Sequence, residues 1–229
     1  QNIEAIVDKA YKEVETFTEV SNEPVDDDWI VRFFNCVEDV INEKLQEIWA
    51  KILAGEIKKP RSCSLRTLDL LKNLSVDEAI IFEKVSSCMC RNGDSIFIPK
   101  KTDLWKKQDV SFDDLMALSD AGIVNLSFVN RILYIRDEKN IIYNNYLMGT
   151  LQRSSISSPE SIIISAYFLT ETGKDIYQVI RINQTRSHDF LLAYLSHLKN
   201  ENMNVSVSAY DVIGATDRYI EHNPKDLLE

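Results

Sequence analysis

Hydrophobic residues recur at helical spacing through the first ninety residues of the chain. The stripe Ile3, Ile6, Val7, Ala10, Val14 and Phe17 predicts an amphipathic helix over residues 2–19. The strongest run follows at residues 26–79, where three more helices are predicted. Their apolar faces are Trp29, Ile30, Phe33, Phe34 and Val37; then Leu45, Ile48, Trp49, Ile52 and Leu53; then Leu65, Leu68, Leu71 and Leu74. Short connections between such helices are typical of a packed bundle.

Capping residues mark the ends of these helices. The acidic run 26–28 precedes the first, Asn42 the second, and Ser62 or Ser64 the third. Gly55 is expected to end the second helix. Ser75 and Glu78 form a capping box for a fourth helix, which we expect to run from residue 76 to a stop at 92–93. The apolar faces predict one shared core of Trp29, Phe33, Trp49, Leu53, Leu68 and Leu71.

Strand-like segments become frequent after residue 93. Strands are predicted at 96–98, 123–128, 131–136, 141–147, 162–169 and 205–212, with a polar turn at 137–140. Helices are predicted from Ser111, Thr170 and Ser187. Residues 154–160, rich in Ser and interrupted by Pro159, are the best candidate for a linker or loop. We therefore expect an α+β protein with a helical domain at 1–93 and a mixed α+β domain at 94–229.

Two short motifs in the second half resemble winged-helix domains. Leu115, Leu118 and Gly122 lead directly into the two strands predicted at 123–136, as a helix leads into a wing. The segment 169–173, Leu-Thr-Glu-Thr-Gly, is similar to a helix start common in the same group. These motifs imply that the C-terminal half is winged-helix-like.

A longer resemblance covers residues 2–79 well and the rest of the chain in outline. The run LQEIWAKILAGEI, a short basic turn and then SLRTLDLLKNLSVDEA resemble the core signature of the bacterial family domain of unknown function 2806. The order of a helix with a small-residue stop, a leucine helix and LS-x-DEA is also similar to the Abi-alpha family, whose name reflects a proposed link to abortive phage infection. The resemblance implies a bacterial cytoplasmic protein, and the Abi-alpha likeness implies a role in phage defence. Neither carries a catalytic residue over to this chain.

The net charge argues against some classes of function, and the cysteines indicate a cellular compartment. The chain has 229 residues and a formal net charge of -10, which argues against a general nucleic-acid binder and against an anionic membrane surface. No apolar run approaches the roughly eighteen residues that a membrane span requires. Cys36, Cys63, Cys88 and Cys90 lie in or beside helical patterns, which favours a reducing compartment and hence the cytoplasm. Because the chain opens with Gln1 and enters a helix at once, we expect a fragment of a longer protein.

The sequence contains no strong catalytic, metal or cofactor motif. Cys88 and Cys90 have no second pair at zinc-ligand spacing, and the six glycines are too scattered to cradle a phosphate. His188 and Asp189 are neighbours, which point in different directions on a helix. We therefore expect no metal and no cofactor.

Basic residues are the remaining candidates for a contact surface. The helix predicted at 111–121 carries Asp113, Asp114 and Asp120 and no basic residue, so it would repel a DNA duplex and suits protein contact better. The groups that could touch nucleic acid or a partner are Lys100, Lys101, Lys106 and Lys107, together with Lys58, Lys59 and Arg61. An ordinary solvated surface is the simpler explanation of both groups.

These patterns predict a non-enzymatic interaction or regulatory module. The alternative is a winged-helix-type nucleic-acid module that uses Lys100, Lys101, Lys106 and Lys107, and a more remote one is an enzyme whose site is built from scattered Asp, Glu, His and Cys. The helix at 2–19 is expected either to fold back on the helices at 28–55 or to attach to a protein partner or to a second copy of the chain.

Overall fold

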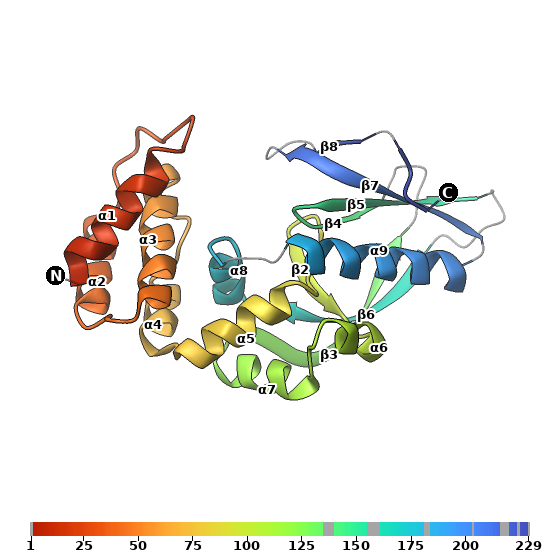
Figure 1. Ribbon diagram of the computed structural model, residues 1–229, viewed down its shortest axis with the longest axis horizontal. Helices are drawn as coiled ribbons and strands as arrows, with labels where there is room; N and C mark the ends of the chain where they lie inside the picture. Colours follow the sequence, from red (N-terminus) through yellow and green to blue (C-terminus); the bar gives the residue numbers. More distant parts are fainter. Residues whose placement is uncertain are drawn as a thin grey trace. The chain divides into compact units, whose positions relative to one another are not determined.

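The computed structural model describes residues 2–134, 140–154, 161–180, 184–202, 204–215, 220–223 and 225–228. These residues form an α+β protein with mostly helices in the first half and strands in the second, as predicted. The chain divides into two compact units (Figure 1). The helical unit comprises Gln1–Phe82, Ala117–Val124 and Thr170–Arg181, and the sheet unit comprises Glu83–Met116, Asn125–Leu169 and Ile182–Glu229. Each unit takes residues from both sides of residue 93, and the predicted domain boundary there stays a prediction.

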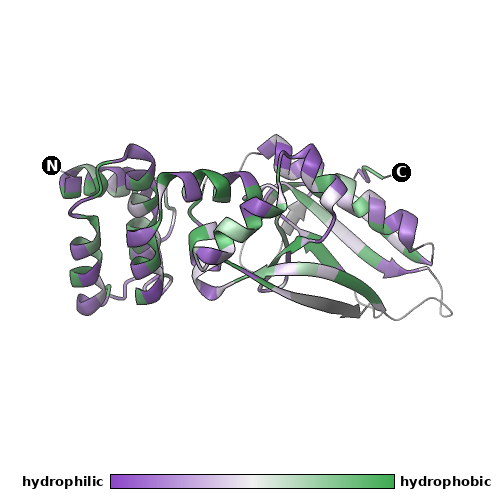
Figure 2. Ribbon diagram, turned by 90° about the horizontal axis from the view of Figure 1, so that it is seen from below, coloured by the Kyte–Doolittle hydropathy of each residue, from purple (hydrophilic) through white to green (hydrophobic). Residues whose placement is uncertain are grey.

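The helical unit is built from helices that carry both hydrophobic and hydrophilic residues (Figure 2). They are α1 (Asn2–Val14), α2 (Asp27–Val37), α3 (Glu43–Lys58), α4 (Leu65–Asn73), the first part of α5 (Val76–Ser86) and α8 (Glu171–Tyr177). Helices α1 to α4 are amphipathic. α1 lies beside α3, and α4 contacts both α2 and α8. α1 ends at Val14, five residues before the predicted end.

The predicted starts of α2, α4 and α5 are confirmed by their capping bonds, whereas the helix predicted from Ser187 begins at Gln184. The side chain of Asp26 accepts the amide N–H of Trp29 at 3.0 Å, and Ser64 caps α4. Ser75 and Glu78 form the capping box in both directions, with N–O distances of 2.7 and 3.1 Å. Each bond satisfies an amide that the first turn of a helix leaves without a partner.

The predicted core is also confirmed. Its six side chains are between 0 and 9% exposed: Trp29, Phe33, Trp49, Leu53, Leu68 and Leu71. The rings of Trp29 and Phe33 stack at 5.2 Å, and Phe33 meets Trp49 edge to face at 5.5 Å. The indole N–H of Trp29 donates to the carbonyl of Cys63 at 2.9 Å, so the ring is buried without leaving a polar atom unpaired.

Two further predicted helix ends are wrong. α3 continues through Gly55 to Lys58, because the last turn is held by the Lys59 amide bonding to the Gly55 carbonyl. α5 ends at Ser86, and the segment predicted to finish it forms the strand β1 (Cys90–Asn92). Gly93, with φ of 56°, belongs to the turn into β2 (Ser95–Pro99) rather than to a helix stop.

The sheet unit holds an antiparallel sheet. Its further strands are β3 (Val124–Tyr134), β4 (Asn140–Tyr143), β5 (Leu147–Arg153), β6 (Ser161–Leu169), β7 (Val205–Ala215) and β8 (Ile220–His222). Among the described residues the strand order is β3-β6-β2-β1-β4-β5-β7-β8. The two strands predicted at 123–136 are the single strand β3, so the described residues do not form the expected wing there. The predicted strand at 141–147 is instead β4, a turn at Asn144 and the start of β5.

The sheet unit also contains the end of α5, α6 (Thr102–Lys107), which was not predicted, the first part of α7 (Phe112–Asp120) and α9 (Gln184–Glu201). α9 lies along β5 and β7 (Figure 1). An added Cβ on Gly149 of β5 would lie 2.2 Å from a methyl of Leu195, so any other residue there would force the Leu195 side chain to move. In the predicted loop at 154–160, residues 155–160 lie outside the described residues, as do residues 137–139 of the predicted turn.

The start of α8 explains the Leu-Thr-Glu-Thr-Gly motif. The Thr170 hydroxyl accepts the Gly173 amide at 3.0 Å and donates to the Gly122 carbonyl at 2.7 Å. A Cβ on Gly173 would lie 2.2 Å from the carbonyl oxygen of Ile123. The motif therefore fixes α8 against the turn at 122–123, within the helical unit.

Candidate functional site

The four lysines predicted as a contact surface lie around α6, but they do not all remain available. The ammonium of Lys101 lies 3.2 Å from a carboxylate oxygen of Glu201, and that of Lys100 lies 5.9 Å from the ring centroid of Tyr167. Lys106 and Lys107 are exposed in the last turn of α6. Part of the predicted cationic charge is thus neutralised by an acidic side chain that lies 100 residues away in the chain.

The other predicted basic group lies in the helical unit. Lys58 and Lys59 end α3, and Arg61 follows in the loop to α4 with φ of 69°. The structure therefore places the two basic groups in different compact units.

The cysteines are held as neutral thiols. Burial raises the pKa of Cys88 to about 12 and the pKa of Cys90 well above its ordinary value, and both side chains are 0% exposed. Burial, together with nearby Asp175 and Glu56, also raises the pKa of Cys63. A reactive or metal-binding cysteine needs a thiolate, which these surroundings disfavour. Within the described ranges, no group of three or more His, Cys, Asp and Glu is placed to hold a metal ion.

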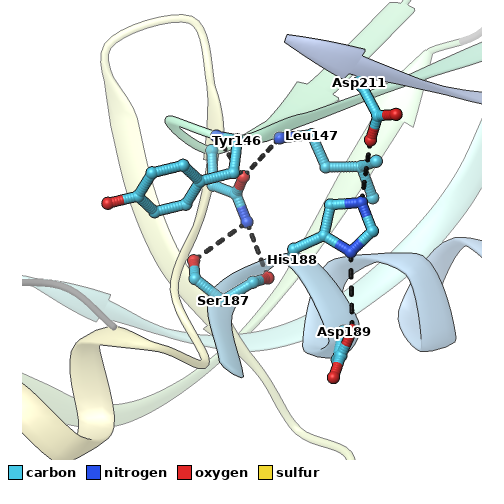
Figure 3. Close-up of polar contacts among 7 residues, drawn as sticks. Tyr146, Leu147, Ser187, His188, Asp189 and Asp211 are labelled. Atoms are coloured by element: carbon cyan, nitrogen blue, oxygen red, sulfur yellow. Dashed lines mark hydrogen bonds and ion pairs between the residues drawn. The ribbon is translucent and has the colours of Figure 1, made fainter. Parts of the chain in front are cut away.

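His188 forms the centre of a polar cluster in the sheet unit (Figure 3). Its Nε2 lies 2.9 Å from Asp211 on β7, and its Nδ1 lies 3.5 Å from Asp189. The neighbouring Ser187 is fully buried and its Oγ accepts a hydrogen bond from the Asn144 amide at 3.1 Å. Ser187 therefore turns toward the β4–β5 turn and is not activated by His188 as a nucleophile would be.

Asn144 uses its whole side chain to join α9 to the sheet. Its oxygen accepts the amides of Tyr146 and Leu147 at 2.9 and 2.8 Å, and its nitrogen donates to the Ser187 carbonyl at 2.9 Å (Figure 3). A fully satisfied buried amide rigidifies its surroundings. The cluster fixes the start of α9 on the β5 strand, and Asp211 is the member that local sequence reasoning could not identify.

A second polar cluster organises the loop between α3 and α4. Glu56 is 1% exposed, and its carboxylate accepts hydrogen bonds from the Arg61 amide at 2.5 Å, the Ser62 hydroxyl at 3.1 Å and the Cys63 amide at 2.9 Å. The three donors surround the carboxylate and replace the water that it loses on burial. Sequence reasoning missed Glu56 because its partners lie five to seven residues further on, outside any helix or cap pattern.

Asp175 on α8 holds the same loop from the other end. One of its oxygens accepts the Ser64 amide at 3.2 Å and the Thr67 hydroxyl at 2.6 Å. The loop is therefore fixed between a carboxylate of α3 and a carboxylate of α8.

α1 exposes part of its apolar surface. Ile6 and Ala10 are 0% and 2% exposed, on the side that packs in the helical unit. Ile3, Val7 and Tyr11 recur every four residues and are 36%, 38% and 64% exposed. We call these three residues the α1 stripe. The sequence predicted one continuous seam, whereas α3 covers only part of it.

Acidic side chains border the α1 stripe. Glu4 and Asp8 are exposed and lie on the helix beside Tyr11, on the side away from Ile6, and the exposed Glu15 follows the end of the helix. The stripe is thus an apolar row with an acidic rim, a combination that can contact a protein surface through burial of its row.

Comparison with known proteins gives a family and no relative of assigned activity. A family model described as "Protein of unknown function (DUF2806)" matches residues 1–193. No curated protein and no solved structure matches the chain. The match confirms the resemblance found in the sequence, while the Abi-alpha likeness stays a prediction. Among the described residues, no helix has both the length and the apolar character that crossing a membrane requires.

Proposed function

This chain belongs to the DUF2806 family, and because that family's description assigns no activity, we propose from the geometry that it is a non-enzymatic protein-interaction module. The α1 stripe is its contact surface. The observation that carries this proposal is the row of Ile3, Val7 and Tyr11, which stays exposed on a helix whose other side is buried.

The size of the α1 stripe suits a regulatory contact. Complete burial of a large apolar side chain contributes about 1.5–3 kcal/mol, and these three side chains start partly covered. The row can therefore form the centre of an interface, but its burial provides only part of the binding free energy. Such a contact can be broken and remade, as regulation requires.

We place this module in the bacterial cytoplasm and connect it with phage defence. The support is the family resemblance for the setting and the Abi-alpha likeness for the process. Both are parts of the proposal that an experiment in the native host can test.

A photo-cross-linking amino acid at position 11 tests the contact in cells. With p-benzoylphenylalanine in place of Tyr11, we expect one discrete protein adduct, which the further change Val7→Asp suppresses. The same group in place of Lys12, which is exposed on the same helix but outside the α1 stripe, is the matched control.

The adduct is then identified by mass spectrometry and its binding is measured with purified proteins. Val7→Asp should weaken that binding at least ten-fold, which corresponds to about 1.4 kcal/mol, while circular dichroism shows an unchanged fold. Equal cross-linking at positions 11 and 12, or a binding affinity that Val7→Asp leaves unchanged, would exclude the α1 stripe as the contact surface.

Nucleic-acid binding is the second candidate function. It is favoured by Lys106 and Lys107, whose side chains are exposed and have no hydrogen bond or ion pair to another residue in the part of the chain that the structure describes. Binding to a single-stranded oligonucleotide that falls steeply with salt, and is lost in Lys106→Glu/Lys107→Glu, would select this candidate. No retention in a gel shift at low salt would reject it.

A further inference from the structure

A cavity of about 400 Å³ lies within the helical unit, at the C-terminal half of α3. Ile52, Phe17 and Val179 form apolar parts of its wall, and Lys51 and Lys58 are among its polar parts. The volume is within the range of roughly 300–1,000 Å³ that small-molecule sites occupy. None of the residues of the α1 stripe lines this cavity, so it is a separate feature.

Gly55 forms part of the cavity wall, although the fold does not require glycine there. It lies inside α3, its φ is not positive, and an added Cβ would come no closer than 4.0 Å to Ser62 Oγ. Glycine is, after proline, the least favourable residue in a helix interior. At Gly173, by contrast, packing excludes any side chain. The missing side chain at Gly55 therefore leaves space in the cavity, while the helix is less stable for it.

Two lysines of α3 bracket this space. Lys51 and Lys58 lie on the same side of the helix as Gly55, four residues before it and three after it. Neither ammonium has a hydrogen bond or an ion pair to another described residue, and Lys58 Nζ lies 4.9 Å from the Phe17 ring centroid. Both positive charges are therefore available to a bound anion.

The cavity also contains two carboxylates, and they are not equivalent. Asp175 is turned toward the loop, where it accepts hydrogen bonds from Ser64 and Thr67. Glu13 lies on α1 and has no side-chain bond to a described residue. The lining of the cavity therefore carries two carboxylates as well as two lysines, so it is not a uniformly cationic surface.

We propose that this cavity binds a small molecule with one anionic head group, a phosphate or a carboxylate, on an apolar body. The head group lies over Gly55 between the ammonium groups of Lys51 and Lys58. The apolar body contacts Phe17, Ile52 and Val179. Because Ser62 and Cys63 also line the cavity and are held by Glu56, the bound molecule contacts the α3–α4 loop directly.

The test uses phenyl phosphate and benzoate as probes and benzylamine as the cationic control. In a ¹H–¹⁵N spectrum of the whole chain, both anionic probes should shift the amide signals of Gly55, Ser62 and Cys63 saturably, and benzylamine should not. Gly55→Leu should abolish these shifts and raise the melting temperature, because leucine fills the cavity and favours the helix. This rise distinguishes loss of space from loss of fold.

The lysines are tested with a matched pair of variants. Lys51→Ala/Lys58→Ala should weaken both anionic probes at least ten-fold, whereas Lys12→Ala, on the exposed side of α1, should leave them unchanged. Retained binding in Gly55→Leu, equal affinity for benzylamine, or no saturable shift with either anionic probe overturns the proposal. A head-group preference between phenyl phosphate and benzoate identifies which anion the site takes.

Discussion

Replacement of Glu56 by alanine should destabilise the helical unit more than its single deleted carboxylate suggests. The change removes the common acceptor of three donors: the Arg61 amide, the Ser62 hydroxyl and the Cys63 amide. A donor left unsatisfied costs about 1–3 kcal/mol when it is buried. The Cys63 bond is buried and the other two are partly buried. If each partly buried donor contributes about 1 kcal/mol, the total loss is about 3–5 kcal/mol.

Urea denaturation followed by tryptophan fluorescence measures this loss. Trp29 and Trp49 lie in the core of the helical unit. A Trp105→Phe background removes the signal of the sheet unit, and all variants are compared in it. Glu56→Gln, which keeps one acceptor oxygen, should lose about half as much as Glu56→Ala.

Glu47→Ala is the matched control, because Glu47 is exposed on the same helix. It should change the free energy of unfolding by no more than about 0.5 kcal/mol. If Glu56→Ala remains within about 1 kcal/mol of this control, water satisfies the three donors, and the loop does not depend on the buried carboxylate.

Two further outcomes follow from the core and from the charged groups. Trp49→Ala should cost about 3–5 kcal/mol in the same urea titration, because the ring is 1% exposed and contacts Phe33; a loss below about 1.5 kcal/mol would contradict this packing. Burial opposes ionisation of Asp114, but hydrogen bonds from Lys84 and Ser111 outweigh it and lower the pKa of Asp114. Its contribution is therefore present above the unfolded-state pKa of about 4 and is lost as the pH falls through the lower folded-state pKa. Asp114→Asn should accordingly destabilise the chain at pH 7 and approach wild type at pH 2 to 3 in parallel denaturation curves, and a pH-independent difference would contradict the assignment.

Local chemistry explains which parts of the fold the sequence predicts. The caps at Asp26, Ser64 and Ser75 bond to atoms within three residues, so the local sequence is enough to predict them. The helix faces follow from periodicity, and the buried core confirms them. The prediction for the end of α5 was wrong because the buried residues after it, including Cys88 and Cys90, continue the apolar run. Periodicity alone cannot assign such a run to helix or strand.

The clusters escape prediction because their members are distant in sequence. Asp211 meets His188 across 23 residues, and Asp175 meets Ser64 across 111. The α1 stripe was only half predictable. Its apolar periodicity is explicit in the sequence, but which residues α3 covers depends on the geometry of packing.

The three-segment composition of the helical unit has a consequence for synthesis on the ribosome. α8 contacts α4 and supplies Asp175 to the loop before it, yet α8 emerges about a hundred residues later. The α8-facing side of α4 therefore stays uncovered in the nascent chain while much of the sheet unit is translated. A chaperone that binds this uncovered side should act between the emergence of α4 and that of α8, and a slowed elongation rate over that interval should increase aggregation of the nascent chain.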